Sequence, residues 1–355
     1  MNSEVINADN LFDFTVDVES GRMARVLQIT DIQIIDAAQK RFPNRLGDKH
    51  MERWATDTTE ENYKRYVREV IERTEPDLII MTGDLVYGEF DDNGSALLGI
   101  IEFMDSFGIP WAPVFGNHDN ESEMGVDWQS KQLEGSQYCL FKQRKLTGNG
   151  NYTVAIRQGG VPTRVFYMLD SNGCYLMSNT SLLNGHSKRE AGFGEDQIEW
   201  YSTSIKNVKN AYPEVKISFA FHIQLSAFKD SFRAHRYDPT EPVNLGLGGD
   251  GGDFGYLGSS LKSEWDKDHK IWNDIRRFGV DSVFVGHEHA NSISLTYEGI
   301  RLQYGQKSST YDRANYDKDG KYICSYFEEG MPVVGGNLIP LSEDGTIVNP
   351  SIILV

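Results

Sequence analysis

The chain has 355 residues and a formal net charge of −17, which comes from 35 basic and 52 acidic residues spread along the sequence. This balance excludes a protein that holds the nucleic-acid backbone on a basic face, although bound divalent cations would still allow a phosphate substrate. No stretch approaches the ~20 uninterrupted apolar residues of a membrane helix, and Met1–Asp17 lacks the basic start and apolar centre of a secretory signal. We therefore expect a cytoplasmic protein without a membrane span.

The first third of the chain alternates strand-like and helical patterns. Residues 25–30 are a short β-prone run, and residues 60–74 carry apolar side chains at helical spacing. The continuous apolar run 77–82 has the length of a buried strand. The same order then returns, with a predicted helix at 95–107 and a predicted strand at 111–115.

The later part of the chain adds more strands. We predict strands at 164–169, 215–221 and 281–285, helices at 196–207 and 261–278, and a mostly β-prone tail at 292–355. This order predicts an α/β (mixed α+β) fold, a four-layer αββα sandwich of two mixed β-sheets flanked by helices. We expect one domain over residues 1–355, with a motif-bearing core at about 24–310 and a β-rich C-terminal extension at 311–355.

A glycine-rich loop and three separated cysteines carry little functional signal. Residues 231–260 suit neither a helix nor a strand, and we interpret them as a loop that either covers the active site or lies on the surface. The loop lacks the Lys-Ser/Thr pair of a P-loop. Cys139, Cys174 and Cys324 form no C-x-x-C pair, so we interpret them as small buried apolar residues.

Five short polar clusters each directly follow a strand-like run. They are Asp31-Ile32-Gln33, Gly83-Asp84, Gly116-Asn117-His118-Asp119, His222, and Gly286-His287-Glu288-His289. Polar residues at the carboxyl ends of neighbouring strands meet in one crevice of an open α/β sheet. Each cluster alone has an ordinary explanation, such as a turn or a buried histidine, but the five together predict one site. Their carboxylate, amide and imidazole groups are ligands suited to Mn, Mg, Zn or Fe.

This series of clusters resembles the calcineurin-like metallophosphoesterases, whose motifs run D-x-H, G-D-x-x, G-N-H-D/E, a lone His and G-H-x-H. Two further motifs support the resemblance. Leu169-Asp170-Ser171 resembles the family's strand-end LDS motif, and residues 196–200 resemble its xQxxW helix. Residues 109–120 and 221–223 resemble most closely the purple-acid-phosphatase-like branch. The resemblance covers about residues 24–310.

The resemblance implies a role for each polar residue. It implies two metal sites that share one bridging carboxylate, with Asp31 and His289 in the first, Asn117, His222 and His287 in the second, and Asp84 between them. A hydroxide that bridges the metals would attack phosphorus in line with the leaving oxygen. His118 would act on the leaving group as a general acid or as a hydrogen-bond donor, and Asp119 or another carboxylate would orient it.

Two positions depart from the family pattern. Gln33 stands where the family usually has His, and its carbonyl oxygen is a harder and weaker ligand than imidazole, which favours Mn or Mg over Zn. Tyr87 matches the tyrosine that binds ferric iron in purple acid phosphatases. We favour Gln33 as the ligand at this coordination position because the ferric-site partner pattern Asp-x-Gly does not appear at Asp31, which is followed by Ile32 and Gln33. Packing beneath the site is the alternative role for Tyr87.

The predicted activity is metal-dependent hydrolysis of a phosphomonoester or phosphodiester at a dinuclear centre, with a small-molecule phosphate ester as the substrate. One alternative is a non-catalytic member of the family that serves as a binding scaffold. Another is a single-metal hydrolase with an emptied first site, which Gln33 suggests. Because Asp84 and His118 are both present, the sequence favours the enzyme. It leaves the substrate, the metal identity (Mn, Fe, Zn or Mg) and the oligomeric state open.

Overall fold

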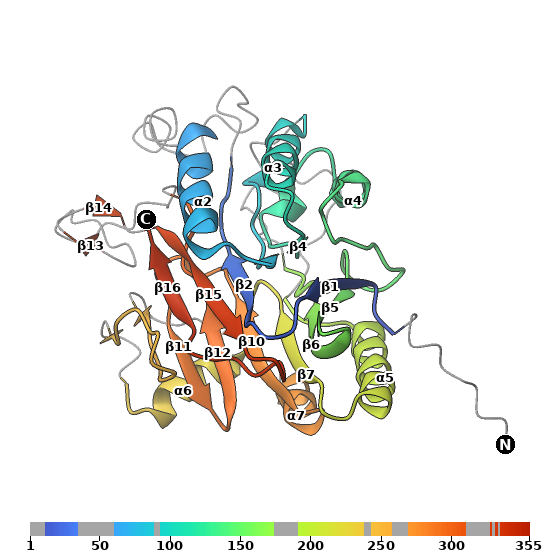
Figure 1. The fold of residues 1–355 in the computed structure, drawn as a ribbon. Helices are drawn as coiled ribbons and strands as arrows, with labels where there is room; N and C mark the ends of the chain where they lie inside the picture. The colour runs from blue at the N-terminus through green and yellow to red at the C-terminus, as the bar shows by residue number, and fades with distance from the viewer. Residues whose placement is uncertain are drawn as a thin grey trace, which may run out of the picture.

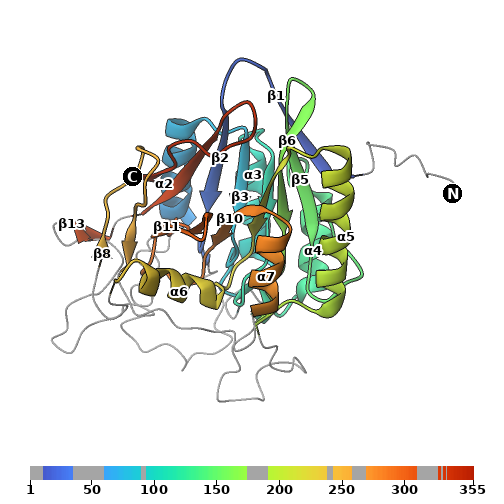
Figure 2. The ribbon, with the colours of Figure 1, turned by 90° about the horizontal axis from the view of Figure 1, so that it is seen from below.

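Two β-sheets lie face to face at the centre of the molecule, and helices cover their outer faces (Figures 1 and 2). The structure is a computed structural model that describes residues 11–34, 60–88, 93–173, 191–237, 243–257, 269–309, 327–328, 331–332 and 334–355. The arrangement confirms the predicted αββα sandwich.

The smaller sheet has the strand order β16-β15-β2-β3-β4. Its strands are β2 (Ala24–Ile29), β3 (Leu78–Met81), β4 (Trp111–Pro113), β15 (Gly335–Leu341) and β16 (Ser351–Leu354). The strands β2, β3 and β4 are parallel, whereas β15 runs antiparallel to β2. Helices α2 (Glu60–Thr74) and α3 (Ser95–Asp105) lie on the outer side. The C-terminal strands β15 and β16 are thus part of a central sheet.

The larger sheet has the strand order β1-β5-β6-β7-β10-β12-β11. Its strands are β1 (Phe14–Val18), β5 (Tyr152–Gln158), β6 (Val161–Met168), β7 (Lys216–Ala220), β10 (Val280–Val285), β11 (Ser294–Tyr297) and β12 (Ile300–Tyr304). Parallel pairing joins β6, β7, β10 and β12 side by side. Its outer face carries α5 (Glu195–Ala211), α6 (Ser226–Ala234) and α7 (His269–Arg277).

Shorter elements lie around the two sheets. Helix α4 (Val126–Gly135) contacts α3, and two short strand pairs join β8 (Val243–Asn244) to β9 (Tyr256–Leu257) and β13 (Phe327–Glu328) to β14 (Met331–Pro332). Among the described helices, none is both long and apolar enough to cross a membrane.

Apolar side chains form one core layer between the sheets and another beneath the helices of the larger sheet. Strand β3 is buried at every position, as expected of a strand covered on both faces. Ile29 from the smaller sheet and Phe166 and Phe284 from the larger sheet belong to one buried cluster. A second cluster joins the larger sheet to its helices and includes Tyr201 and Ile275. Both layers hold the strand ends from which the polar clusters project.

The glycine-rich segment differs from its prediction, and the elements β1, α4 and β5 were not predicted. We expected residues 231–260 to contain neither a helix nor a strand, but α6 extends to Ala234 and the β8–β9 pair lies within the segment. The prediction missed α6 because its apolar residues, Phe228 and Phe232, are too few to mark a helix by themselves, whereas in the fold both are buried.

The other predicted elements agree with the structure apart from small shifts at their ends. The predicted helix 60–74 corresponds to α2 over its whole length. Of the predicted helix 261–278, the described part is α7, and residues 261–268 lie outside the described residues. Cys139 is buried as predicted, while Cys174 and Cys324 lie outside the described part of the chain.

A buried arginine ties neighbouring strands together at the amino ends of β6, β7 and β10. Arg164 is fully buried, and its guanidinium donates to both Asp281 carboxylate oxygens, at 2.7 Å and 2.8 Å, and to the hydroxyl of Ser282 at 3.0 Å. Removing Arg164 deletes the charged group that joins these strands and leaves the Asp281 carboxylate without its cation. We expect Arg164→Met to lower the free energy of unfolding by roughly 3–5 kcal/mol, measured by urea denaturation.

The matched control is Arg157→Met in the neighbouring strand β5. Arg157 pairs with Asp17 across β5 and β1, but the Asp17 side chain is 62% exposed, so solvent screens the pair. An exposed pair of this kind contributes about 0.2–1 kcal/mol. Equal destabilisation by the two substitutions would contradict the role that we assign to Arg164.

Candidate metal centre

The predicted polar clusters come together at the carboxyl ends of strands from both sheets. Asp31, Asp84 and Asn117 follow β2, β3 and β4 of the smaller sheet, whereas His222 and His287 follow β7 and β10 of the larger one. A hydrogen bond joins the two sheets at this edge, because the His222 Nδ1 lies 2.8 Å from the backbone oxygen of Thr82. The site therefore depends on the packing of the two sheets and not on either sheet alone.

The backbone at this edge adopts a conformation that L-residues rarely take. Asp31, Gln33, Asp84 and His287 have φ angles of 52°, 49°, 53° and 75°, respectively. Non-glycine residues at positive φ cost of order 1–3 kcal/mol each and concentrate at functional sites. Four residues from three separate clusters share this feature. The strained backbone at these positions costs local stability and orients their side chains.

Glycines allow neighbouring segments to approach closely at this site. A Cβ atom at Gly83, whose φ is +94°, would lie 2.5 Å from the His222 ring. A Cβ atom at Gly116 would lie 2.2 Å from an Asp84 carboxylate oxygen. Any side chain at either position would displace a predicted metal ligand.

Three side chains form the first group of potential ligands. Single ligand atoms of Asp31, Asp84 and His289 all lie within 4.8 Å of one another. His289 Nε2 is 3.2 Å from Asp31 Oδ1, and Thr30 Oγ1 donates to Asp31 Oδ2 at 2.6 Å. The group matches the residues that the family resemblance implies for the first metal together with the bridging carboxylate.

Three other side chains form the second group. Asn117 Oδ1 lies 2.9 Å from His287 Nδ1 and 3.1 Å from His222 Nε2. Asp84 Oδ2 is 3.3 Å from the same His222 nitrogen. Asp84 therefore belongs to the first group and also contacts the second.

The charge distribution of the site favours a cation. Burial alone would raise the pKa of Asp84, yet His222 and His118 hold it below its usual value. Burial alone would lower the pKa of His222, but the Asp84 carboxylate raises it to about 10. Two buried carboxylates, Asp31 and Asp84, thus stabilise positive charge strongly at this edge. The donor set of carboxylate, amide and imidazole atoms fits divalent metal ions.

Gln33 lies beside the predicted bridging ligand. Its Nε2 donates to Asp84 Oδ2 at 2.8 Å, whereas its Oε1 is buried and has no hydrogen-bond partner among the described residues. A buried carbonyl oxygen without a donor is costly, and a cation would satisfy it. The contact agrees with the preference for Gln33 over Tyr87, and ligation by either side chain remains a prediction.

We expect Gln33→His to strengthen metal binding at the first site, because imidazole is a stronger ligand than an amide oxygen. The dissociation constant for Zn should fall by at least about tenfold, which corresponds to about 1.4 kcal/mol, in calorimetric titration. Gln33→Ala is the opposing variant and should weaken the same site. If neither substitution changes the affinity for metal, Gln33 is not near a metal ion.

His118 is held between an aromatic ring and a carboxylate. The Tyr87 ring stacks on it with centroids 4.1 Å apart and planes 22° from parallel, which is the packing role that we gave as the alternative for Tyr87. The His118 Nδ1 lies 2.7 Å from Glu121 Oε2. The backbone N–H of His118 donates to Asp84 Oδ1 at 2.9 Å, so the His118 backbone is held against the predicted bridging ligand.

The carboxylate of Asp119 has a different environment. It accepts the backbone N–H groups of Val86 at 3.0 Å and Gly116 at 2.7 Å. Burial and the nearby Asp84 carboxylate raise its pKa well above the usual range. The geometry thus favours Glu121 over Asp119 as the carboxylate that orients His118, while Asp119 holds the loops after β3 and β4 together.

Sequence reasoning missed two residues of this site. Glu121 lies in the 3-10 turn Asp119–Glu121, and its spacing of three residues from His118 was the signal that could have identified it. Lys307 is 3% exposed, and its Nζ is 3.5 Å from His289 Nδ1. No local pattern identifies Lys307, because it reaches the site through the bridge between Thr30 and Lys307.

Comparison with known proteins adds independent information. A model of the family described as "Calcineurin-like phosphoesterase" matches residues 24–291. "Probable inactive purple acid phosphatase 28" from Arabidopsis thaliana is 26% identical over 288 residues, which make up 76% of this chain and 68% of that protein. "Phosphatase DCR2" from Saccharomyces cerevisiae is 26% identical over 263 residues, which make up 68% of this chain and 41% of that protein.

One solved structure shows a similar fold. A dimetal phosphatase from Danio rerio superposes with a TM-score of 0.55 and 13% sequence identity, and the alignment covers 94% of this chain and 99% of that chain. At this level of identity the likeness extends to the fold alone.

Proposed function

We propose that this chain, which belongs to the calcineurin-like phosphoesterase family, hydrolyses a phosphomonoester or phosphodiester at a dinuclear metal centre. The observation that carries the proposal is the position of Asp84, which contacts both groups of potential ligands in a site that also holds the buried Asp31 carboxylate. We expect Mn, Fe, Zn or Mg as the metals. A small-molecule phosphate ester is the proposed substrate.

Each of the predicted site residues has a separate role in the proposed reaction. Asp31 and His289 would hold the first cation, and Asn117, His222 and His287 the second, with Asp84 shared between the two. When bound, the two cations would activate water as the nucleophile and neutralise the charge of the phosphoryl oxygens. His118 would donate a proton or a hydrogen bond to the leaving oxygen, and Glu121 would keep its imidazole in position.

A non-catalytic scaffold is the alternative that must be tested, because curated relatives such as purple acid phosphatase 28 carry the word "inactive" in their names. Two observations support an enzyme instead. Four of the ten non-glycine residues at positive φ in the described part of the chain are predicted ligands, and a binding scaffold does not need strain at these positions. The His118–Glu121 pair is buried beside the site and matches a proton donor with its orienting carboxylate.

The test is turnover of p-nitrophenyl phosphate and of its bis ester by protein loaded with Mn, Zn, Fe or Mg. We expect hydrolysis that depends on metal and is lost after chelation. Absence of metal-dependent turnover on both compounds, and on a broad panel of natural phosphate esters, would favour the scaffold. Active protein that binds a single equivalent of metal even in excess Mn would instead support a one-metal hydrolase.

A further inference from the structure

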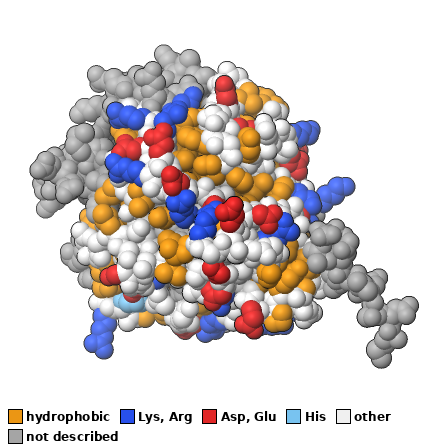
Figure 3. All heavy atoms as spheres, viewed as in Figure 1, with side chains coloured by type: hydrophobic (Ala, Val, Ile, Leu, Met, Phe, Trp, Pro, Cys, Tyr) orange, Lys and Arg blue, Asp and Glu red, His pale blue; other side chains and the backbone are white. Residues whose placement is uncertain are grey.

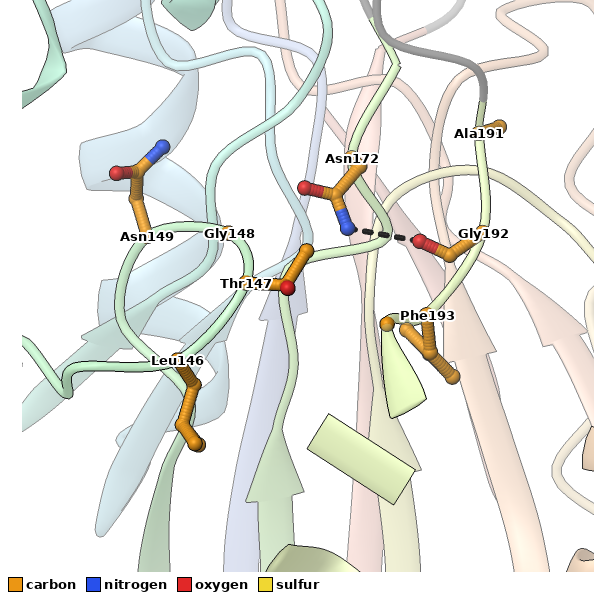
Figure 4. Close-up of a pocket in the computed structure, with 9 residues that line it drawn as sticks. Leu146, Thr147, Gly148, Asn149, Asn172, Ala191, Gly192 and Phe193 are labelled. Atoms are coloured by element: carbon orange, nitrogen blue, oxygen red, sulfur yellow. Dashed lines mark hydrogen bonds between the residues drawn. The ribbon is translucent and has the colours of Figure 1, made fainter. Parts of the chain in front are cut away.

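A cavity of about 530 Å³ lies between residues 146–149, Asn172 and residues 191–194 (Figure 4). This volume is within the range of small-molecule sites. Figure 4 shows Asn172 between the turn that carries Thr147 and the segment that carries Gly192 and Phe193. The cavity lies beyond the carboxyl end of β6, the end of the sheet at which the candidate metal centre also lies.

Two buried side chains fix the walls of the cavity. The Asp170 carboxylate accepts the backbone N–H groups of Asn149 at 2.7 Å and Asn172 at 2.8 Å. The Gln197 amide oxygen accepts the N–H of Gly194 at 2.7 Å, and its nitrogen donates to the Asp170 backbone oxygen at 2.9 Å. Asp170 and Gln197 belong to the LDS and xQxxW marks, so both motifs shape this cavity.

The described lining is polar but carries no charged side chain. It consists of glycines and of Leu146, Thr147, Asn149, Asn172, Ala191 and Phe193. Asn172 Nδ2 donates to the Gly192 oxygen at 2.7 Å, whereas Asn172 Oδ1 is buried without a hydrogen-bond partner among the described residues. A buried carbonyl oxygen in this state favours a ligand that brings a donor, such as a hydroxyl group. The described part of the lining, which is uncharged, disfavours a charged ligand.

Hydrogen bonds connect the segments around the cavity to the loops that carry His118 and His222. Asn120, two residues after His118, donates to the Gly116 backbone oxygen at 2.9 Å and accepts from the Asn149 amide at 3.4 Å. On the other side, the N–H of Ile223, the residue after His222, donates to Ser171 Oγ at 3.0 Å. The cavity therefore flanks the loops that carry His118 and His222.

We propose that this cavity binds the alcohol portion of the substrate, and that this portion is an uncharged polyol or sugar. The inference rests on the proposed phosphoesterase activity. The phosphoryl group would lie on the cations, and the oxygen that leaves with the alcohol would face His118. An uncharged, hydroxylated alcohol suits a cavity whose walls present amides, glycine backbone and one aromatic ring, and whose buried amide oxygen lacks a donor.

The test compares esters that share the phosphate and differ in the alcohol. The panel contains glycerol phosphate, inositol monophosphate and hexose phosphates, beside nucleoside monophosphates, a phosphoserine peptide and p-nitrophenyl phosphate. Two variants alter the cavity, since Ala191→Phe fills it and Asn149→Ala removes an amide. Leu98→Phe, at a position that is 43% exposed on α3, is the control for an added ring, and thermal unfolding shows whether each variant is folded.

We expect one of the polyol or sugar phosphates to have the highest kcat/KM. Ala191→Phe should lower kcat/KM for that ester at least about tenfold more than it lowers kcat/KM for p-nitrophenyl phosphate. The inhibition constant of inorganic phosphate, which reports the phosphoryl site alone, should change less than about twofold. A preference for nucleotides or for the peptide, or an equal loss on every ester, would overturn the inference. Absence of turnover on all esters would instead overturn the proposed function.

Discussion

Asp84→Asn should abolish metal-dependent phosphate ester hydrolysis, with a loss in kcat of at least about 10³-fold. The Asp84 carboxylate contacts His222 at 3.3 Å and Gln33 at 2.8 Å, and it is the group that both sets of potential ligands share. An amide at this position cannot supply the negative charge that holds two cations together. Steady-state kinetics and elemental analysis of bound metal would measure both losses.

Asp17→Asn is the matched control for this substitution. Asp17 is an exposed carboxylate on β1 whose partner is Arg157, so this variant should retain its activity and its metal. If Asp84→Asn retains two equivalents of metal and ordinary turnover, then the shared ligand of the centre has been misidentified.

His118→Ala should lower kcat by about 10²–10⁴-fold on esters with a poor leaving group, while the metal content stays constant. The reason is that His118 would serve the leaving oxygen and not the cations. An alkyl phosphate should lose more rate than p-nitrophenyl phosphate, because p-nitrophenolate leaves without protonation. The measurement is the ratio of kcat/KM values for the two esters.

Glu121→Gln should produce a weaker form of the same defect, about 10–100-fold, because the 2.7 Å contact with His118 Nδ1 orients the imidazole. Asp119→Asn provides the contrast, since its carboxylate holds backbone N–H groups and its loss should lower stability without selecting among leaving groups. A uniform loss on both esters in His118→Ala, or loss of metal from that variant, would contradict the assignment.

The strand ends could be predicted because their signal is local. An apolar run such as Leu78–Met81 followed by Gly83 and Asp84 places a carboxylate at the end of a buried strand, whatever the rest of the fold is. The order of the strands, including β15 beside β2, depends on contacts between residues more than 300 positions apart and could not be inferred from any such pattern. A single domain over residues 1–355 remains a prediction.

The partners of the predicted residues were harder to identify than the residues themselves. The choice between Asp119 and Glu121 depends on the 3-10 turn after His118, which points one carboxylate at the backbone and the other at the imidazole. Lys307 reaches His289 only because β2 and the segment after β12 are neighbours in the fold. Such contacts arise from tertiary packing, for which the sequence gives no spacing rule.

Anomalous scattering from crystals soaked in manganese tests the central claim most directly. We expect two peaks, one among Asp31, Asp84 and His289 and the other among Asp84, Asn117, His222 and His287, separated by about 3.5–4 Å. Crystals with no peak among these side chains, or with manganese bound only elsewhere on the protein, would contradict the account.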